Sequence, residues 1–111
     1  MVLGASVQSA PMLEIVSVDD PPGLRLAGEI DLATVGQLTE ALEPHVRAGG
    51  DITLDLTGVR FMGSLGVQVL IRTVHSLGGR GRLVLANPVR SVRRLLEVMG
   101  LDRFDNLEVR T

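Results

Sequence analysis

The sequence lacks cysteine, lysine, tryptophan and tyrosine, and it contains only two aromatic residues, Phe61 and Phe104. Without cysteine, the chain can form neither a disulfide nor a thiolate metal site. Aromatic side chains that stack on bases are therefore scarce, and the calculated pI is about 5.6. These features argue against nucleic acid as a partner.

Long apolar runs are also missing from the sequence. No run reaches the roughly 18 residues that a membrane span requires. Residues 1–10 lack the positive region and apolar core of a signal peptide. We therefore expect a soluble cytoplasmic protein without a membrane span, with residues 1–11 as a flexible N-terminal tail. The remaining residues, 12–111, are enough for one domain with a single hydrophobic core.

Charge is unevenly distributed along the chain. The formal net charge is −2, yet residues 67–98 hold six arginines against the single acid Glu97. This imbalance leaves open a phosphate-containing or other small ligand near Arg80 to Arg94. The favoured interpretation is that these arginines are solvated on helix faces and turns.

The N-terminal half has the pattern of a hairpin followed by a helix. Apolar residues predict strands over 12–19 and 24–30, and Asp19 to Gly23 between them has the composition of a turn. Thr34 and Gln37 fit a capping box at the start of a helix that Gly49 ends. Pro44 predicts a bend or fraying in the last turn of that helix.

The C-terminal half repeats an alternation of strand and helix. Strands are predicted over 51–56 and 82–86, and a short closing strand over 107–109. Helices are predicted over 64–77 and from Asn87 to Gly100. Ser64 and Asn87 are the predicted N-caps of these helices. The order ββαβαβα(β) predicts an α/β fold: a mixed sheet of four to five strands, three main helices, and parallel pairing beyond the hairpin.

Few residues have the spacing that catalysis or metal binding requires. His45 and His75 lie 30 residues apart on different helices, so no metal site or cofactor is predicted. Gly78 to Gly81 precedes a strand, whereas a phosphate loop precedes a helix. Ser64 has no histidine base nearby and does not fit the Gly-x-Ser-x-Gly pattern. We predict no catalytic residues and no enzymatic activity.

Ser64 then has two remaining interpretations, a helix cap or a hydroxyl that is modified. A phosphate would add about −1.5 to −2 charges, which a helix N-terminus tolerates. A partner packed on the same surface would instead have to bury that charge. The apolar neighbours Met62, Leu65 and Val67 predict an exposed contact patch around the serine. The local residues alone favour the cap.

Four segments carry a resemblance to a known family. They are residues 28–33 (GEIDLA), 51–66 (DITLDLTGVRFMGSLG), 81–88 (GRLVLANP) and 92–101 (VRRLLEVMGL). In this order and at these intervals they resemble the STAS domain of bacterial anti-sigma factor antagonists. The resemblance covers about residues 12–110.

The resemblance implies a switch between partners. In such proteins the unphosphorylated antagonist binds an anti-sigma factor of the GHKL kinase type, which frees a sigma factor. The kinase phosphorylates a serine at the start of the second helix, and a PPM-type phosphatase removes the phosphate. The matching serine is Ser64; the expected partner-binding residues are Asp31, Met62, Gly63, Ser64 and Leu65.

One departure from the family pattern keeps an alternative open. The family usually has Asp-Ser-Ser/Thr-Gly at this turn, and here Gly63 and Leu65 flank Ser64. The alternative is a STAS scaffold that is not phosphorylated, or a subunit of a larger complex of the stressosome or transport-associated kind. Neither the residues nor the resemblance predicts an oligomeric state.

Overall fold

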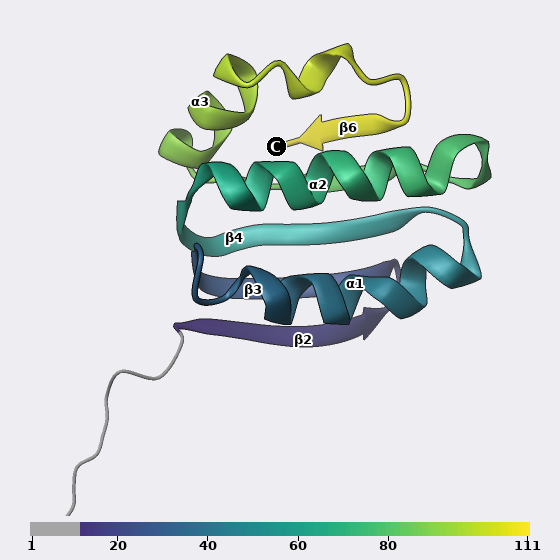
Figure 1. Cartoon of the computed structure of the whole chain (residues 1–111), viewed down its shortest axis with the longest axis horizontal. Coiled ribbons are helices and arrows are strands. Elements are labelled where there is room, and N and C mark those ends of the chain that lie inside the picture. The colour runs from purple at the N-terminus through teal and green to yellow at the C-terminus, as the bar shows by residue number, and fades with distance from the viewer. Residues whose placement is uncertain (1–11) are drawn as a thin grey trace, which may run out of the picture.

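A mixed sheet of five strands runs through residues 12–111, the part of the chain that the computed structural model describes (Figure 1). The expected tail, residues 1–11, lies outside the described residues. In chain order the elements are β2 (Leu13–Asp19), β3 (Pro22–Ile30), α1 (Val35–Ala48), β4 (Ile52–Met62), α2 (Ser64–Leu77), β5 (Leu83–Ala86), α3 (Arg90–Val98) and β6 (Leu107–Arg110), with 3₁₀ turns at Gly78–Arg80 and Leu101–Arg103.

The strand order in the sheet is the order in the chain, β2-β3-β4-β5-β6. Only β2 and β3 are antiparallel, and each later strand joins its neighbour in parallel. This confirms the predicted fold class and element order, including the fifth strand. Because each right-handed crossover adds its strand on the same side, the connecting helices cover one face of the sheet.

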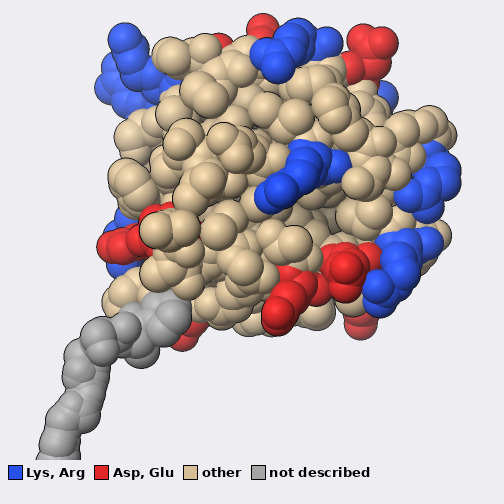
Figure 2. All heavy atoms as spheres, in the orientation of Figure 1, with Lys and Arg blue, Asp and Glu red and all other residues tan. Residues whose placement is uncertain are grey.

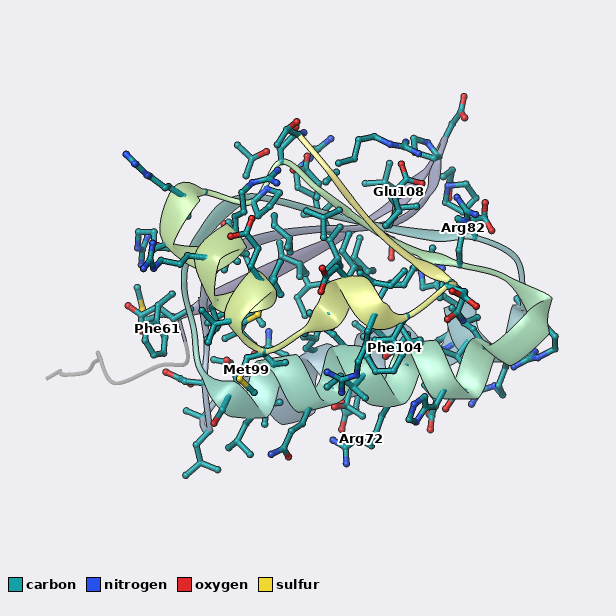
Figure 3. The ribbon with its side chains drawn as sticks, turned by 90° about the horizontal axis from the view of Figure 1, so that it is seen from above. Phe61, Arg72, Arg82, Met99, Phe104 and Glu108 are labelled. Carbon is teal, nitrogen blue, oxygen red and sulfur yellow. The ribbon has the colours of Figure 1, made fainter. Side chains whose placement is uncertain are left out.

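One continuous apolar core lies between that face and the helices. Each helix contributes a buried stripe to it, and the facing strand residues complete it: Leu38, Leu42, Leu70, Val74, Val92 and Leu96 from the helices, with Leu26, Ile30, Leu54, Leu56 and Leu85 from the strands. The opposite face has no helix over it among residues 12–111. In Figure 3, Arg82 and Glu108 lie on this uncovered side, away from α2.

The β2–β3 hairpin is tighter than the sequence predicts. Asp19 pairs with Pro22, so Asp20 and Pro21 alone form the turn. Gly28 is required within β3, because its φ is +119° and an added Cβ would collide with the carbonyl of Met12. A side chain at this position would push the two strands apart.

The strand β4 is longer than predicted, since it ends at Met62 rather than Leu56. Arg25 pairs with Asp55, but Ala27 pairs with Gly58, so the register shifts by one residue between these pairs. A second shift of one residue follows at once, because Gly28 pairs with Val59 but Glu29 pairs with Phe61. A shift of this kind breaks the alternation of buried and exposed positions. The alternation of buried residues therefore stops at Leu56, but the strand continues, with Val59 and Met62 as its next buried residues.

The capping box predicted for α1 is wrong. Thr34 is the N-cap, but its side chain makes no capping hydrogen bond. The hydroxyl instead donates to the carbonyl of Glu29 at 2.8 Å and accepts from the amide of Asp31 at 3.0 Å. Gln37 donates to the carbonyl of Leu13 on β2, at 3.0 Å. The helix runs through Pro44 to Ala48.

Both other predicted N-caps are also wrong. Gly63 is the N-cap of α2, and Ser64 is its first helical residue. Val89 precedes α3, while Asn87 has a φ of 56° in the left-handed region that asparagine tolerates. No helix within residues 12–111 is both long and apolar enough to cross a membrane.

Candidate functional site

The candidate site lies where β3 and β4 end and α1 and α2 begin. The amide of Gly63 donates to the carbonyl of Ile30 at 2.8 Å, which holds the β4–α2 turn against the β3–α1 turn. Parallel strands end at the same edge of a sheet, so two turns far apart in sequence meet here. This contact joins the regions of two segments that the sequence singles out, GEIDLA and GSLG.

Ser64 is exposed at the first position of α2. Its hydroxyl has no hydrogen-bond partner among residues 12–111, and α2 has no side-chain cap within that range. The capping interpretation of Ser64 is therefore wrong in this structure. A hydroxyl in this position is accessible to a modifying enzyme.

The first turn of α2 favours negative charge beside Ser64. The carbonyl of Gly63 accepts hydrogen bonds from the amides of Gly66, at 3.0 Å, and Val67, at 3.4 Å. The earlier amides of the turn have no helical acceptor, and no acidic residue occupies the turn. A phosphate on Ser64 would meet the positive end of the helix dipole without a competing carboxylate from the same turn.

The apolar surface around Ser64 differs from the predicted patch. Met62 is only 5% exposed and Val67 is fully buried, so the expected exposure of these two residues is wrong. The exposed apolar side chains are instead Leu32 at 78%, Phe61 at 52% and Leu65 at 36%. We call these three residues the apolar rim.

Phe61 is the rim residue that sequence reasoning missed. The second register shift, between Gly28 and Glu29, turns Met62 toward the core, and Phe61 then projects beyond the end of the sheet (Figure 3). Its ring lies close to Gly63. A signal was present, since Phe61 is one of only two aromatic residues and it adjoins the turn. Leu32 lies within the GEIDLA segment, between Asp31 and α1.

Asp31 shapes the neighbouring turn. One carboxylate oxygen accepts from the amide of Ala33 at 3.0 Å and from the hydroxyl of Thr34 at 3.4 Å. Its carbonyl accepts the amide of Val35 at 2.8 Å. Asp31 is half-buried, and its turn is joined to the Ser64 turn through the hydrogen bond between Gly63 and Ile30.

The two glycines around Ser64 have different roles. Gly63 has φ −86° and ψ 173°, an extended conformation open to any residue. An added Cβ there would make ordinary contact with Phe61, at 3.6 Å. At Gly66, an added Cβ would lie 2.7 Å from Ile30 Cγ2 and 2.9 Å from Met62 Cγ. Packing of α2 on the sheet requires Gly66, whereas an acid could replace Gly63.

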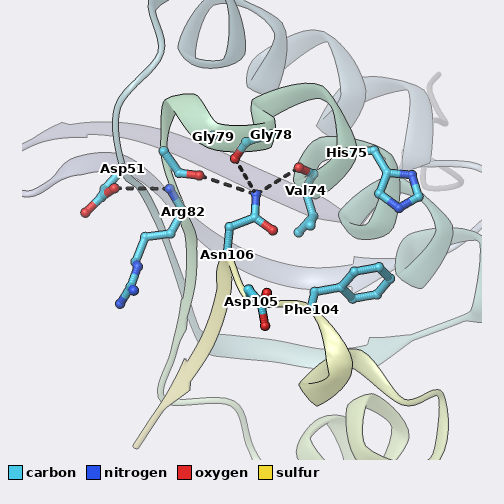
Figure 4. Close-up of a pocket in the computed structure, with 10 residues that line it drawn as sticks. Asp51, Val74, His75, Gly78, Gly79, Arg82, Phe104, Asp105 and Asn106 are labelled. Atoms are coloured by element: carbon cyan, nitrogen blue, oxygen red, sulfur yellow. Dashed lines mark hydrogen bonds between the residues drawn. The ribbon is translucent and has the colours of Figure 1, made fainter.

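A shallow hollow lies at the other end of α2 (Figure 4). It has a volume of about 570 Å³. The side-chain amide of Asn106 crosses one wall and donates to three carbonyls, those of Val74 at 2.9 Å, Gly78 at 3.1 Å and Gly81 at 3.3 Å. These bonds join the end of α2 to the start of β6, which is a structural role.

Other charged groups are paired or dispersed. On the uncovered face, hydrogen bonds from the hydroxyl and amide of Thr57, and to a lesser degree the Arg25 guanidinium, lower the pKa of Asp55. In Figure 2, acidic side chains gather over α1 on the helix-bearing face, and much of the remaining surface is uncharged. Within residues 12–111, no three histidine or acidic side chains are grouped to hold a metal ion.

The arginines between residues 67 and 98 do not form one patch. Arg80 and Arg82 lie near the end of α2 and the start of β5, whereas Arg90, Arg93 and Arg94 lie on α3, which follows the other end of β5. Arg82 is also paired with Glu108 at 3.0 Å. Their arrangement supplies no converging set of cations for a phosphate.

Comparison with known proteins identifies the domain. A family model described as "Mlab, STAS domain" matches residues 13–109. The anti-sigma-F factor antagonist RsfB of Mycobacterium tuberculosis is 34% identical over 99 residues, which is 86% of this chain and 81% of RsfB.

Two solved structures are similar along most of their length. An anti-sigma factor antagonist from Mycobacterium paratuberculosis superposes with a TM-score of 0.74 and 29% identity, covering 91% of this chain and 90% of that one. The anti-sigma factor antagonist SpoIIAA in its unphosphorylated form gives a TM-score of 0.67 and 27% identity, covering 80% and 78%.

Proposed function

The chain belongs to the STAS-domain family, and we propose that it is an anti-sigma factor antagonist controlled by phosphorylation of Ser64. In the unphosphorylated state it binds an anti-sigma factor of the GHKL kinase type, and a sigma factor is released. The names of the relatives support the antagonist role. The exposed Ser64 hydroxyl at the start of α2, beside the apolar rim, supports the switch.

Phosphorylation would act on the interface rather than on the fold. The kinase transfers the γ-phosphoryl group of ATP to Ser64 Oγ; ADP leaves and the hydroxyl proton is lost. The helix N-terminus stabilises the added charge in the free protein. A partner that packs on Leu65 and Phe61 would have to desolvate the phosphate, which is costly without a matching cation. Hydrolysis by a PPM-type phosphatase restores the hydroxyl.

Binding of the purified cognate anti-sigma factor to two serine variants tests this proposal. We expect Ser64→Ala to bind like the wild-type protein, because alanine leaves the apolar surface intact. We expect Ser64→Asp to bind at least about tenfold more weakly, which corresponds to about 1.4 kcal/mol. Isothermal titration calorimetry measures both affinities, and equal binding by the two variants would contradict the switch.

A matched control places the same charge elsewhere on α2. Ser76 is exposed in the last turn of the helix, about 18 Å from Ser64 along the axis. Ser76→Asp should leave partner binding unchanged. A similar loss of affinity in both aspartate variants would mean that charge in general, not charge at the Ser64 turn, disturbs the complex.

The second candidate function is a STAS scaffold without phosphorylation, favoured by Gly63 in place of the usual acid. Because the backbone at Gly63 accepts any residue, Gly63→Asp can restore the family pattern without strain. Intact-mass measurement after incubation with the cognate kinase and ATP distinguishes the candidates. One phosphate on wild-type protein, absent from Ser64→Ala, supports the switch. Phosphate only on Gly63→Asp supports the scaffold.

A further inference from the structure

Among residues 12–111, no strand pairs with the outer edge of β2. Glu29 donates its amide to the carbonyl of Met12, at 2.6 Å, so these two residues form a hydrogen-bonded pair of the β2–β3 ladder. Such pairs alternate along an antiparallel ladder. The backbone groups of Glu14, Val16 and Val18 therefore point toward β3. Those of Leu13, Ile15 and Ser17 point away from the sheet.

Only part of this edge is protected. Gln37 of α1 donates to the outward carbonyl of Leu13, at 3.0 Å. Within residues 12–111, the amides and carbonyls of Ile15 and Ser17 have no strand or side chain bound to them, and Figure 1 shows β2 at the border of the sheet. The free stretch is thus three residues long and centred on Val16.

Apart from the charges of Glu14 and Asp19, the strand lacks the usual devices that prevent edge pairing. Such devices include short length, lysine, proline and bulges. β2 has seven residues, contains neither lysine nor proline, and pairs with β3 in an unbroken register. Val16 is 52% exposed. The opposite edge, β6, is protected by contrast: it has four residues, and its Glu108 is paired with Arg82 and Arg110.

We propose that the β2 edge is a homodimer interface, in which β2 of a second copy pairs with it in antiparallel fashion about a two-fold axis at Val16. In this register Ile15 exchanges two hydrogen bonds with Ser17 of the second copy, and Ser17 exchanges two with its Ile15. The amides and carbonyls of Ile15 and Ser17 are all used in each copy, and the Gln37 bond to Leu13 is left intact. The two five-stranded sheets become one sheet of ten strands.

The side chains of β2 fit this register. Glu14 faces Val18 of the second copy and Asp19 faces its Leu13, so no two like charges lie opposite each other, which would be destabilising. The two Val16 side chains meet at the axis on the uncovered face and bury each other. This self-complementarity about one residue favours a second copy over an unrelated extended peptide.

Single-cysteine cross-linking tests the register directly, because the chain has no cysteine of its own. Residues opposite each other in a non-hydrogen-bonded pair have Cα atoms about 4.5 Å apart, within disulfide range. We expect Val16→Cys to form a disulfide-linked dimer under mild oxidation. Glu14→Cys is the matched control, since four residues of offset separate its copies by about 13 Å.

Sedimentation velocity over a dilution series tests the dimer without a cross-link. We expect wild-type protein to dimerise and Ser17→Pro to be monomeric, because proline removes an amide that points away from β3. The far-ultraviolet circular dichroism of Ser17→Pro should match the wild type. Val16→Lys is a second disrupting variant that adds like charges at the axis and leaves the backbone unchanged.

Three results would overturn the proposal. The first is a wild-type protein that stays monomeric at every soluble concentration. Another is a dimer that survives both Ser17→Pro and Val16→Lys, which would place the interface elsewhere. The last is dimerisation only after residues 1–11 are removed, which would make that segment the occupant of the edge.

Discussion

At the scale of single residues, Gly66 has the strictest requirement near the candidate site. The start of α2 packs so closely on the sheet that an added Cβ would lie within 3 Å of side-chain atoms of Ile30 and Met62. Those two side chains are buried and cannot move freely. Gly66 therefore sets how closely the helix that carries Ser64 approaches the strands.

We predict that Gly66→Ala lowers the free energy of unfolding by about 1–3 kcal/mol, the usual cost of overpacking a core. Gly36 is the matched control, because it is exposed in the first turn of α1 and an added Cβ there meets no atom within 4 Å. Gly36→Ala should raise the free energy of unfolding by about 0.4–1 kcal/mol. Urea denaturation of both variants measures the difference, and equal signs would contradict the packing argument.

At the scale of elements, the sequence predicts the helix α2 well and the strand β4 poorly. The helix has a clear 3.6-residue period and a glycine after its last turn, so its bounds at Ser64 and Leu77 follow from local pattern. The strand depends on its neighbour β3, because two register shifts, after Arg25 and after Gly28, change which residues of β4 face inward. The residues of β4 alone do not indicate where its pairing with β3 changes register.

The same cause explains the errors at the site. Met62 follows an apparent end of the strand, so it was expected in an exposed turn, whereas the continued strand buries it and exposes Phe61. The side-chain cap predicted at Thr34 is wrong for a related reason. The Thr34 hydroxyl has a backbone acceptor at Glu29 and a backbone donor at Asp31, and these local bonds outside the helix compete with capping.

Hydrogen bonds to Asp55 on the uncovered face of the sheet make stability depend on pH. The Thr57 hydrogen bonds and, to a lesser degree, Arg25 hold the pKa of Asp55 below its ordinary value. Because the folded state lowers this pKa, the stabilisation by Asp55 is present above the unfolded pKa and is lost as the pH falls through the folded value. We predict that Asp55→Asn lowers Tm at pH 7, and that the difference from wild type narrows below about pH 4.

Thr57→Val provides the control for that pH dependence. Thr57 contributes the largest lowering of the Asp55 pKa, through a hydroxyl at 2.7 Å from the carboxylate. In a Thr57→Val background the effect of Asp55→Asn on Tm at pH 7 should be smaller. Thermal unfolding of the four proteins across the acid range measures this coupling. An effect of equal size in both backgrounds would assign the stabilisation to Arg25 alone.

At the scale of the whole molecule, the two proposed surfaces are well separated. Val16 pairs with Arg25, whereas the Ser64 turn is fixed to Ile30, five residues farther along β3. That offset is about 16 Å along the strand. The dimer edge also borders the sheet, and the apolar rim stands at the ends of the strands. Sites at this distance without shared partners usually act independently.

We therefore predict that each surface functions without the other. Monomeric Ser17→Pro should bind the anti-sigma factor with the wild-type affinity per chain, and Ser64→Asp, which loses that binding, should still cross-link when Val16 is replaced by cysteine. Light scattering should find two partner molecules on a wild-type dimer and one on Ser17→Pro. Loss of binding in the monomeric variant would mean that the second copy forms part of the partner site, and that the Ser64 turn alone is not sufficient.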